Sequence, residues 1–84
     1  MGYNKTELLK IVAEYYSVSS EEIISQKRDS LISRARHVAV YLLRKELSLS
    51  YPAIGLFLGG RDHTTAMHSY RKINDFPDLR TMEE

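Results

Sequence analysis

The sequence predicts a small all-α domain that contains a helix-turn-helix. Its 84 residues are 43% hydrophobic and 27% charged, the balance of a soluble globular chain, and they suffice for one compact domain over 1–84. Apolar residues recur at the three- and four-residue spacing of helices along most of the chain. Gly59 and Gly60 separate two such patterns, as in a helix-turn-helix over about 50–73. A core this small leaves no room for a nucleotide-binding α/β fold or a deep catalytic cleft.

Two helices are expected in the first part of the chain. The first occupies about residues 4–17, because Asn4 or Thr6 can cap it and its apolar residues keep helical spacing. The second is short, over about 18–24. Its start offers two serine hydroxyls as caps and two carboxylates in the first turn, which suit the positive end of a helix dipole.

A long third helix should form the centre of the core. Asp29 or Ser30 starts it, and it runs to about Leu47. Two adjacent apolar stripes are expected to be buried, formed by Leu31, Ala35, Val38 and Leu42 and by Ile32, Ala39 and Leu43. The remaining face is polar and basic and collects Arg34, His37, Tyr41, Arg44 and Lys45. Arg36 falls outside that face, so helical phase does not decide where its side chain points.

Two further helices form the predicted helix-turn-helix. Ser50 and Pro52 start the fourth helix, which the glycine pair ends after about two turns. Asp62 caps the fifth helix. Its buried stripe is expected to contain Ala66, Met67, Tyr70 and Ile73. Its opposite face is expected to expose Thr64, Thr65, His68, Arg71 and Lys72. The pattern decays after that, and residues 74–77 read as a turn.

Positive charge is concentrated in the middle of the chain. Residues 27–72 carry nine basic and three acidic side chains, a net charge of +6, whereas the two ends together carry −5. The overall value of +1 hides this division. A concentrated positive field favours a polyanion as partner, because cations that neutralise phosphates release condensed counterions whatever the base sequence. Charge alone does not decide the matter, since many basic faces are only solvated.

The start of the fifth helix has the chemistry of a base-reading surface. In a helix-turn-helix the second helix enters the major groove end-on, and its first residues reach base edges. Here these residues are Arg61, Asp62, His63, Thr64 and Thr65. They combine donors, acceptors and methyl groups that match thymine. The alternative is that Asp62 only caps and the threonines are only solvated, while the helical phase of His63 also allows it to pack on the core.

The run over residues 54–73 resembles the signature of the DNA-binding C-terminal domain of the bacterial replication initiator DnaA. The stretch Gly-Gly-Arg-Asp-His-Thr-Thr at 59–65 is highly specific to that family. Residues 12–16 and 34–42 resemble the same domain in the same order and spacing, so the resemblance covers about 8–73. It implies an all-helical, Trp-repressor-like fold. It also implies a ligand, the asymmetric DnaA box 5′-TTATNCACA in double-stranded DNA at replication origins or promoters.

The resemblance also implies a role for each matching residue. Three side chains would lie on base edges in the major groove: Asp62, His63 and Thr64. Two would lie close to phosphate: Thr65 and His68. Two match positions that contact thymine methyl groups: Tyr51 and Pro52. Arg28 matches an arginine that enters the adjacent minor groove, where A·T-rich sequence deepens the negative potential. Three match backbone-contacting positions: Arg36, His37 and Arg44. Arg61 would contact either a base or a phosphate.

Several positions depart from the family pattern. His37 stands where the family commonly has glutamine, and Tyr51 where it commonly has leucine. Leu56 replaces a usually polar residue and should be exposed. Pro77 indicates that the final helix of the family is absent or cut short. No Gly-x-x-x-x-Gly-Lys-[Ser/Thr] loop occurs, so the ATPase domain of the initiator is not represented. The chain is thus expected to be either an excised initiator domain or a stand-alone relative.

Nothing in the sequence predicts an enzyme, a metal site or a cofactor. The chain has no cysteine, which excludes disulfides, thiolate zinc sites and cysteine catalysis. His63 and His68 are five residues apart and share no helical face. With no membrane span and no signal core, the chain is expected in the cytoplasm, in association with the nucleoid.

Two alternatives to an initiator role stay open. The first is a stand-alone regulator or competitor at DnaA boxes. The second is a protein-interaction adaptor, or a dimer, that uses the Leu56 face. The polar residues at 61–65 favour DNA, because an adaptor would not need them.

Overall fold

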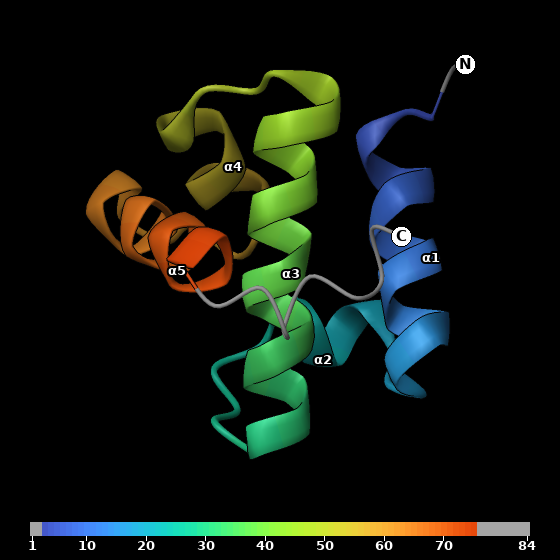
Figure 1. Ribbon diagram of the computed structural model, residues 1–84. Coiled ribbons are helices and arrows are strands. Elements are labelled where there is room, and N and C mark those ends of the chain that lie inside the picture. The colour runs from blue at the N-terminus through green and yellow to red at the C-terminus, as the bar shows by residue number, and fades with distance from the viewer. Residues whose placement is uncertain (1–2, 76–84) are drawn as a thin grey trace.

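Four helices pack around a central one in the computed structural model, which describes residues 3–75. In chain order they are α1 (Lys5–Tyr16), α2 (Ser20–Ile24), α3 (Ser30–Leu47), α4 (Tyr51–Phe57) and α5 (His63–Asp75). Figure 1 shows α3 running through the middle, with α1 on one side of it and α4 and α5 on the other. The prediction of an all-α fold is confirmed. Within residues 3–75, no helix is long and apolar enough to cross a membrane.

Capping boxes define the starts of α1 and α2. The Asn4 side chain accepts a hydrogen bond from the Glu7 main-chain N–H at 2.8 Å, and the Glu7 carboxylate accepts from the Asn4 N–H at 3.1 Å. Ser19 and Glu22 make the same reciprocal pair, at 3.0 and 2.9 Å. Each pair satisfies N–H groups that a helix start leaves without partners. The expected short second helix is therefore present, and Asn4 rather than Thr6 caps the first.

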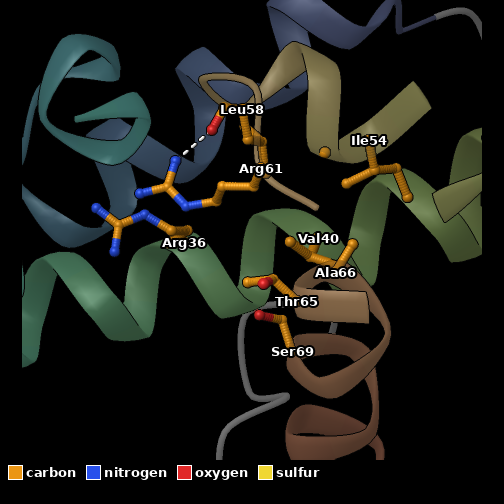
Figure 2. Close-up of a pocket in the computed structure, with 9 residues that line it drawn as sticks. Arg36, Val40, Ile54, Leu58, Arg61, Thr65, Ala66 and Ser69 are labelled. Carbon is orange, nitrogen blue, oxygen red and sulfur yellow. Dashed lines mark hydrogen bonds between the residues drawn. The ribbon is translucent and has the colours of Figure 1, made fainter. Parts of the chain in front are cut away.

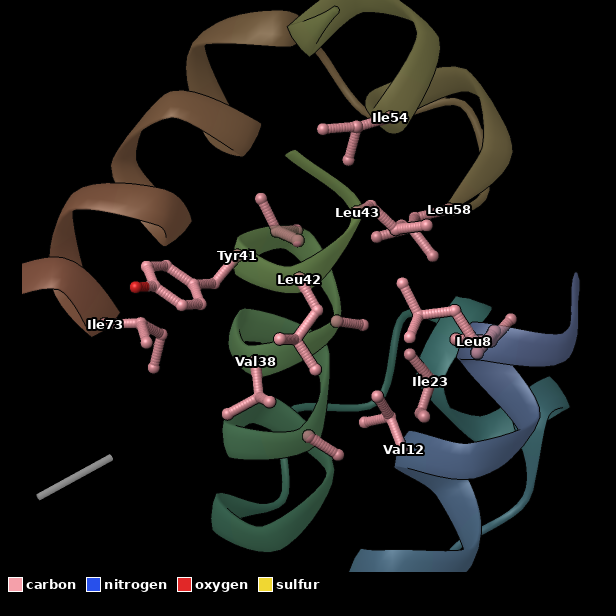
Figure 3. Close-up of a cluster of buried hydrophobic side chains, with 14 of the residues drawn as sticks. Leu8, Val12, Ile23, Val38, Tyr41, Leu42, Leu43, Ile54, Leu58 and Ile73 are labelled. Atoms are coloured by element: carbon pink, nitrogen blue, oxygen red, sulfur yellow. The ribbon is translucent and has the colours of Figure 1, made fainter. Parts of the chain in front are cut away.

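Every helix contributes a completely buried side chain to one hydrophobic cluster. Val12, Ile23, Leu43, Ile54 and Ile73, one from each helix in order, are all 0% exposed. Figure 3 shows them gathered around α3. Burying a side chain of this size contributes about 1.5–3 kcal/mol, so the cluster is the main source of stability. It holds α4 and α5 against α3, and this fixes the position of the helix-turn-helix.

Two residues of α3 do not lie where helical spacing predicted. Leu31, expected in the buried stripe, is 47% exposed, because the first turn of α3 extends past α2 (Figure 1). Tyr41, expected on the polar face, is only 2% exposed. Its ring stacks on that of Tyr70 with centroids 5.1 Å apart, because α5 packs across this part of α3. Helical phase identifies the faces of a helix, and packing by another helix decides which of them is covered.

A tight turn joins α4 to α5 as predicted. Ser50 caps α4, since its hydroxyl oxygen accepts from the Ala53 N–H at 3.2 Å. Gly59 and Gly60 have φ values of 91° and 76°, in the left-handed region that favours glycine. The carbonyl of Asp62 accepts the first hydrogen bonds of α5, from Thr65 and Ala66, at 3.1 and 3.3 Å.

The end of α5 differs from the prediction. The helix continues through Asn74 and Asp75, where a turn was expected. The other half of that predicted turn, with Pro77, lies outside the described residues. The prediction that the final helix of the family is absent or cut short also concerns residues outside the described ones.

Candidate nucleic-acid interface

The first residues of α5 form an exposed polar cluster. Asp62, His63, Thr64 and Thr65 are all exposed. The His63 side chain is 56% exposed, so it does not pack on the core as its helical phase also allowed. Its Nδ1 lies 3.2 Å from Oδ1 of Asp62. A carboxylate acceptor, an imidazole and two hydroxyls with methyl groups therefore stand together at the positive end of a helix. His68 lies exposed farther along the same helix.

Two α4 side chains flank this polar cluster. Pro52 and Leu56 line an open depression of about 360 Å³ together with Gly60, Arg61, Asp62 and His63. Leu56 is 76% exposed, as predicted. It therefore lies beside the polar start of α5 and not on a separate face. The depression offers apolar and polar contacts side by side, which is the combination that reads a thymine methyl group next to a base edge.

Arg44 and Tyr51 form a partly buried unit at the junction of α3 and α4. The Arg44 guanidinium lies 4.6 Å from the centroid of the Tyr51 ring, and its Nη1 donates to the Leu49 carbonyl at 3.0 Å. The Tyr51 ring also meets Tyr70 edge-on, with centroids 6.2 Å apart. Both sequence-predicted residues are thus held in place by neighbours. Arg44 and Tyr51 are each partly exposed.

A positively charged groove lies between the start of α3 and α5. It has a volume of about 300 Å³ and is lined by Arg28, Ser30, Ser33, Arg34, His37 and Lys72. The resemblance pointed to Arg28 and His37 but not to Arg34 or Lys72. Helical spacing placed Arg34 and Lys72 only on exposed faces of their helices. That they line the same groove, one from α3 and one from α5, is visible only in the tertiary structure. Figure 1 shows that α5 and the loop carrying Arg28 lie on the same side of α3, opposite α1.

His37 is uncharged in this groove at neutral pH. Its Nδ1 shares a hydrogen bond of 2.9 Å with the hydroxyl of Ser69. Burial, together with the positive charges of Lys72 and Arg36, lowers the pKa of the imidazole to about 4. His37 can therefore offer one ring nitrogen to a neighbour but not a positive charge. The burial of Ser69, which is 4% exposed, carried no sequence signal.

Arg36 and Arg61 have partners inside the protein. Nε of Arg36 donates to the Ile23 carbonyl at 2.7 Å, and its Nη2 lies 3.0 Å from the carbonyl oxygens of Ser25 and of Lys27. Arg61 donates to the carbonyls of Ile24 and Ser25, at 3.0 and 2.5 Å, and to that of Leu58. Figure 2 shows the two guanidinium groups next to each other. Both were expected to contact DNA, and that expectation stays a prediction. In the structure they donate to main-chain carbonyls, which no sequence pattern reveals.

The described residues contain no cluster of histidine and carboxylate side chains suited to a metal ion.

Comparison with known proteins identifies the family. The family model of the bacterial dnaA protein helix-turn-helix matches residues 6–73. The chromosomal replication initiator protein DnaA of Gloeothece citriformis is 49% identical over 67 residues, which are 80% of this chain and 15% of that protein. The same protein of Lactococcus lactis subsp. cremoris is 47% identical over 64 residues, 76% of this chain and 14% of the relative.

A third relative covers slightly more of the chain. The DnaA protein of Agrobacterium fabrum is 44% identical over 69 residues, 82% of this chain and 14% of that protein. The chain thus spans about one seventh of the length of the curated relatives that it matches. The chain belongs to the bacterial DnaA helix-turn-helix family, the DNA-binding domain that its residues 54–73 resemble.

Proposed function

We propose that this chain binds double-stranded DNA sequence-specifically at DnaA-box-like sites, 5′-TTATNCACA. In the complex the start of α5 enters the major groove and Arg28 enters the adjacent minor groove. The observation that carries the proposal is the exposed cluster of Asp62, His63 and Thr64 at the tip of α5, next to Pro52 and Leu56. Helix tips of this kind read bases in helix-turn-helix proteins.

The chemistry of the tip suits the bases of the box. A carboxylate such as that of Asp62 accepts from the exocyclic amino group of cytosine, and the box contains two cytosines on this strand. His63 offers ring nitrogens to base edges, and the methyl group of Thr64 suits a thymine methyl group. Pro52, across the depression, supplies a further apolar surface. Good contacts of this kind each contribute about 1–3 kcal/mol of discrimination.

Backbone contacts would come from a second set of side chains. Thr65 and His68 are exposed along α5, and Arg44 is partly exposed at the end of α3. The groove lined by His37 adds the positive charges of Arg28, Arg34 and Lys72. Contacts to phosphate set the register of the protein on the duplex and carry no base information. We leave Arg36 out of this set, because its Nε and Nη2 donate to protein carbonyls.

Fluorescence anisotropy tests the proposal directly. The chain is titrated into a duplex that contains one 5′-TTATCCACA box and into a scrambled duplex, each at several salt concentrations. A preference for the box of about a thousandfold, with a salt slope that indicates several phosphate contacts, is expected. Equal affinity for the two duplexes would remove base reading and leave only a basic surface. Absence of binding to both would overturn the proposal.

The biological role follows from where the box-bound domain acts. As part of an initiator it would anchor an assembly at a replication origin; alone, it would occupy boxes as a regulator or competitor, in either case at the nucleoid. Adding the chain to an origin-unwinding reaction with a complete DnaA protein tests whether the chain by itself competes for boxes. Inhibition that a box-free competitor duplex does not relieve indicates competition for boxes, and unchanged unwinding argues against it.

The Leu56 face gives the competing proposal, a protein partner or a dimer. Leu56 and His63 line the same depression, so a partner seated on Leu56 and a duplex on α5 would exclude each other. Sedimentation over a range of protein concentrations, with and without the box duplex, tests this. Self-association that DNA abolishes and Leu56→Ser removes would support an interface. A monomer at all concentrations would exclude the dimer.

A further inference from the structure

Two arginines from distant parts of the sequence converge on one short stretch of backbone. Arg36 comes from α3 and Arg61 from the turn before α5, and both donate to the carbonyl of Ser25. Between them they also engage the carbonyls of Ile23, Ile24 and Lys27. These carbonyls belong to the end of α2 and to the loop that follows, whose oxygens have no partner within a helix. The loop leads directly to Arg28.

The turn that carries Arg61 packs closely against α4 and α2. The main-chain N–H of Arg61 donates to the Gly55 carbonyl at 2.7 Å. A Cβ on Gly55 would overlap the carbonyl oxygen of Arg61, so glycine permits this approach. A Cβ on Gly59 would lie 2.5 Å from the Ile24 carbonyl oxygen, so the turn also touches α2 directly. Arg61 therefore starts from a fixed backbone and reaches α2 with its guanidinium.

This arrangement places two like charges together in a partly buried site. Burial lowers the pKa of both guanidinium groups, and the charge of Arg61 adds to the effect on Arg36. Arginine keeps its proton in proteins, so both remain charged. The carbonyl oxygens provide the compensating negative ends of dipoles, at the end of α2 where the helix dipole is also negative. The two guanidinium groups therefore bind main-chain carbonyls.

We infer that Arg61 is a positioning residue that fixes the Arg28 loop relative to the start of α5. It thereby sets the spacing between the minor-groove and major-groove contacts, and it does not itself contact DNA. The inference rests on the proposed function. Asp62 and His63 follow Arg61 in sequence, and Arg28 follows the loop that Arg61 holds. One side chain thus joins the two reading elements.

The advantage of such a link is preorganisation. Residues 25–29 form no helix, and a loop of this kind loses conformational freedom when it is ordered on DNA. When the guanidinium groups already order the loop in the free protein, the loss of conformational entropy does not occur on binding and does not reduce the affinity for DNA. Arg28 is then already placed to enter the minor groove when His63 meets a base edge in the major groove. Without Arg61, Arg28 would contribute much less to binding, although its own side chain is unchanged.

A double-mutant cycle between Arg61 and Arg28 tests the inference. Arg28→Ala is measured in the wild type and in Arg61→Met, on a box duplex with an A·T-rich flank. Lys10→Met, which removes one charge from the exposed face of α1, serves as the matched control background. In the wild type and in the control, Arg28→Ala should lower affinity about tenfold, and in Arg61→Met less than about threefold. Arg61→Lys, which can still donate to a carbonyl, should restore part of the effect.

Two results of this cycle would overturn the inference. One is that Arg28→Ala lowers the affinity for the box duplex by the same factor in all backgrounds, which would show that Arg61 does not act through the loop. The other is a salt slope that falls by about one in Arg61→Met beyond the control, with the Arg28→Ala effect unchanged. That result would make Arg61 a direct phosphate contact. Circular dichroism and thermal melting establish that each variant is folded, and Arg61→Lys carries the test if Arg61→Met is not.

A measurement without DNA separates this inference from the proposed function. Backbone ¹⁵N order parameters of residues 25–28 should be near 0.85 in the wild type and fall toward about 0.6 in Arg61→Met. Lys10→Met should leave them unchanged. Unchanged order parameters in Arg61→Met would overturn the positioning role even if the box preference is found. Loss of order without any box preference would keep the positioning role and reject the proposed reading of DNA.

Discussion

Nδ1 of His37 lies 2.9 Å from the hydroxyl oxygen of Ser69, and this hydrogen bond joins the middle of α3 to the middle of α5. Ser69 is 4% exposed, and the pKa of His37 is lowered to about 4. His37 also lines the positively charged groove that contains Arg28 and Lys72. A histidine that is neutral at pH 7 therefore contributes to holding α5 on α3.

Stability should fall in mild acid because of His37. The unfolded chain takes up a proton on this imidazole near pH 6.5, whereas the folded chain resists protonation down to about pH 4. Protons therefore favour unfolding, and the stabilisation present above pH 6.5 is lost as the pH falls from 6.5 to 4. The loss should be on the order of 2 kcal/mol, allowing for partial exposure.

Urea unfolding at pH 7 and pH 4.5 measures this loss. His37→Gln should remove most of the difference in unfolding free energy between the two pH values, because glutamine does not titrate. His68→Gln, on the exposed face of α5, is the matched control and should keep it. The same pH dependence in both variants would rule out His37 as its source.

Base reading should be visible in variants at the tip of α5. His63→Ala or Thr64→Ala should cost about 1–3 kcal/mol on the box and much less on a scrambled duplex, because only the box presents the matching base edges. Asn74→Ala, exposed at the other end of α5, should leave both affinities unchanged. Anisotropy on the two duplexes gives the comparison, and equal losses on both would refute base reading.

Arg44 should behave as a phosphate contact. Arg44→Ala is expected to weaken binding to every duplex by the same factor and to reduce the salt slope by about one. Because Arg44 also holds the Leu49 carbonyl and lies over Tyr51, a small loss of thermal stability should accompany the change. Lys10→Met controls for the lost charge. A loss confined to the box duplex would contradict this assignment.

The glycine pair should respond unequally to alanine. Gly60→Ala should cost about 1 kcal/mol, because φ is 76° but nothing lies within 4 Å of the added Cβ. Gly59→Ala should cost about 1–2 kcal/mol more, since its Cβ would also press on the Ile24 carbonyl oxygen at 2.5 Å. Denaturant unfolding of the two variants measures the difference. Equal costs would mean that the contact between the turn and α2 relaxes freely.

The sequence by itself determined the local structure of this protein. The Asn4–Glu7 and Ser19–Glu22 capping boxes, the Ser50 cap and the glycine turn each depend on residues within a few positions of one another. Such short-range hydrogen bonds and backbone preferences can be read from sequence. The signature at 59–65 likewise pointed to the DnaA helix-turn-helix family, because it is a contiguous run.

The tertiary structure alone decided which faces are covered and which arginines are available. Tyr41 and Ser69 are buried because α5 crosses α3, and Leu31 is exposed because the first turn of α3 extends past α2. Arg36 and Arg61 donate to carbonyls of α2 and the following loop, whose positions depend on the packing of all five helices. A sequence shows which side chains can donate hydrogen bonds and which are apolar. Their acceptors and packing neighbours lie far along the chain, and only the folded structure brings them together.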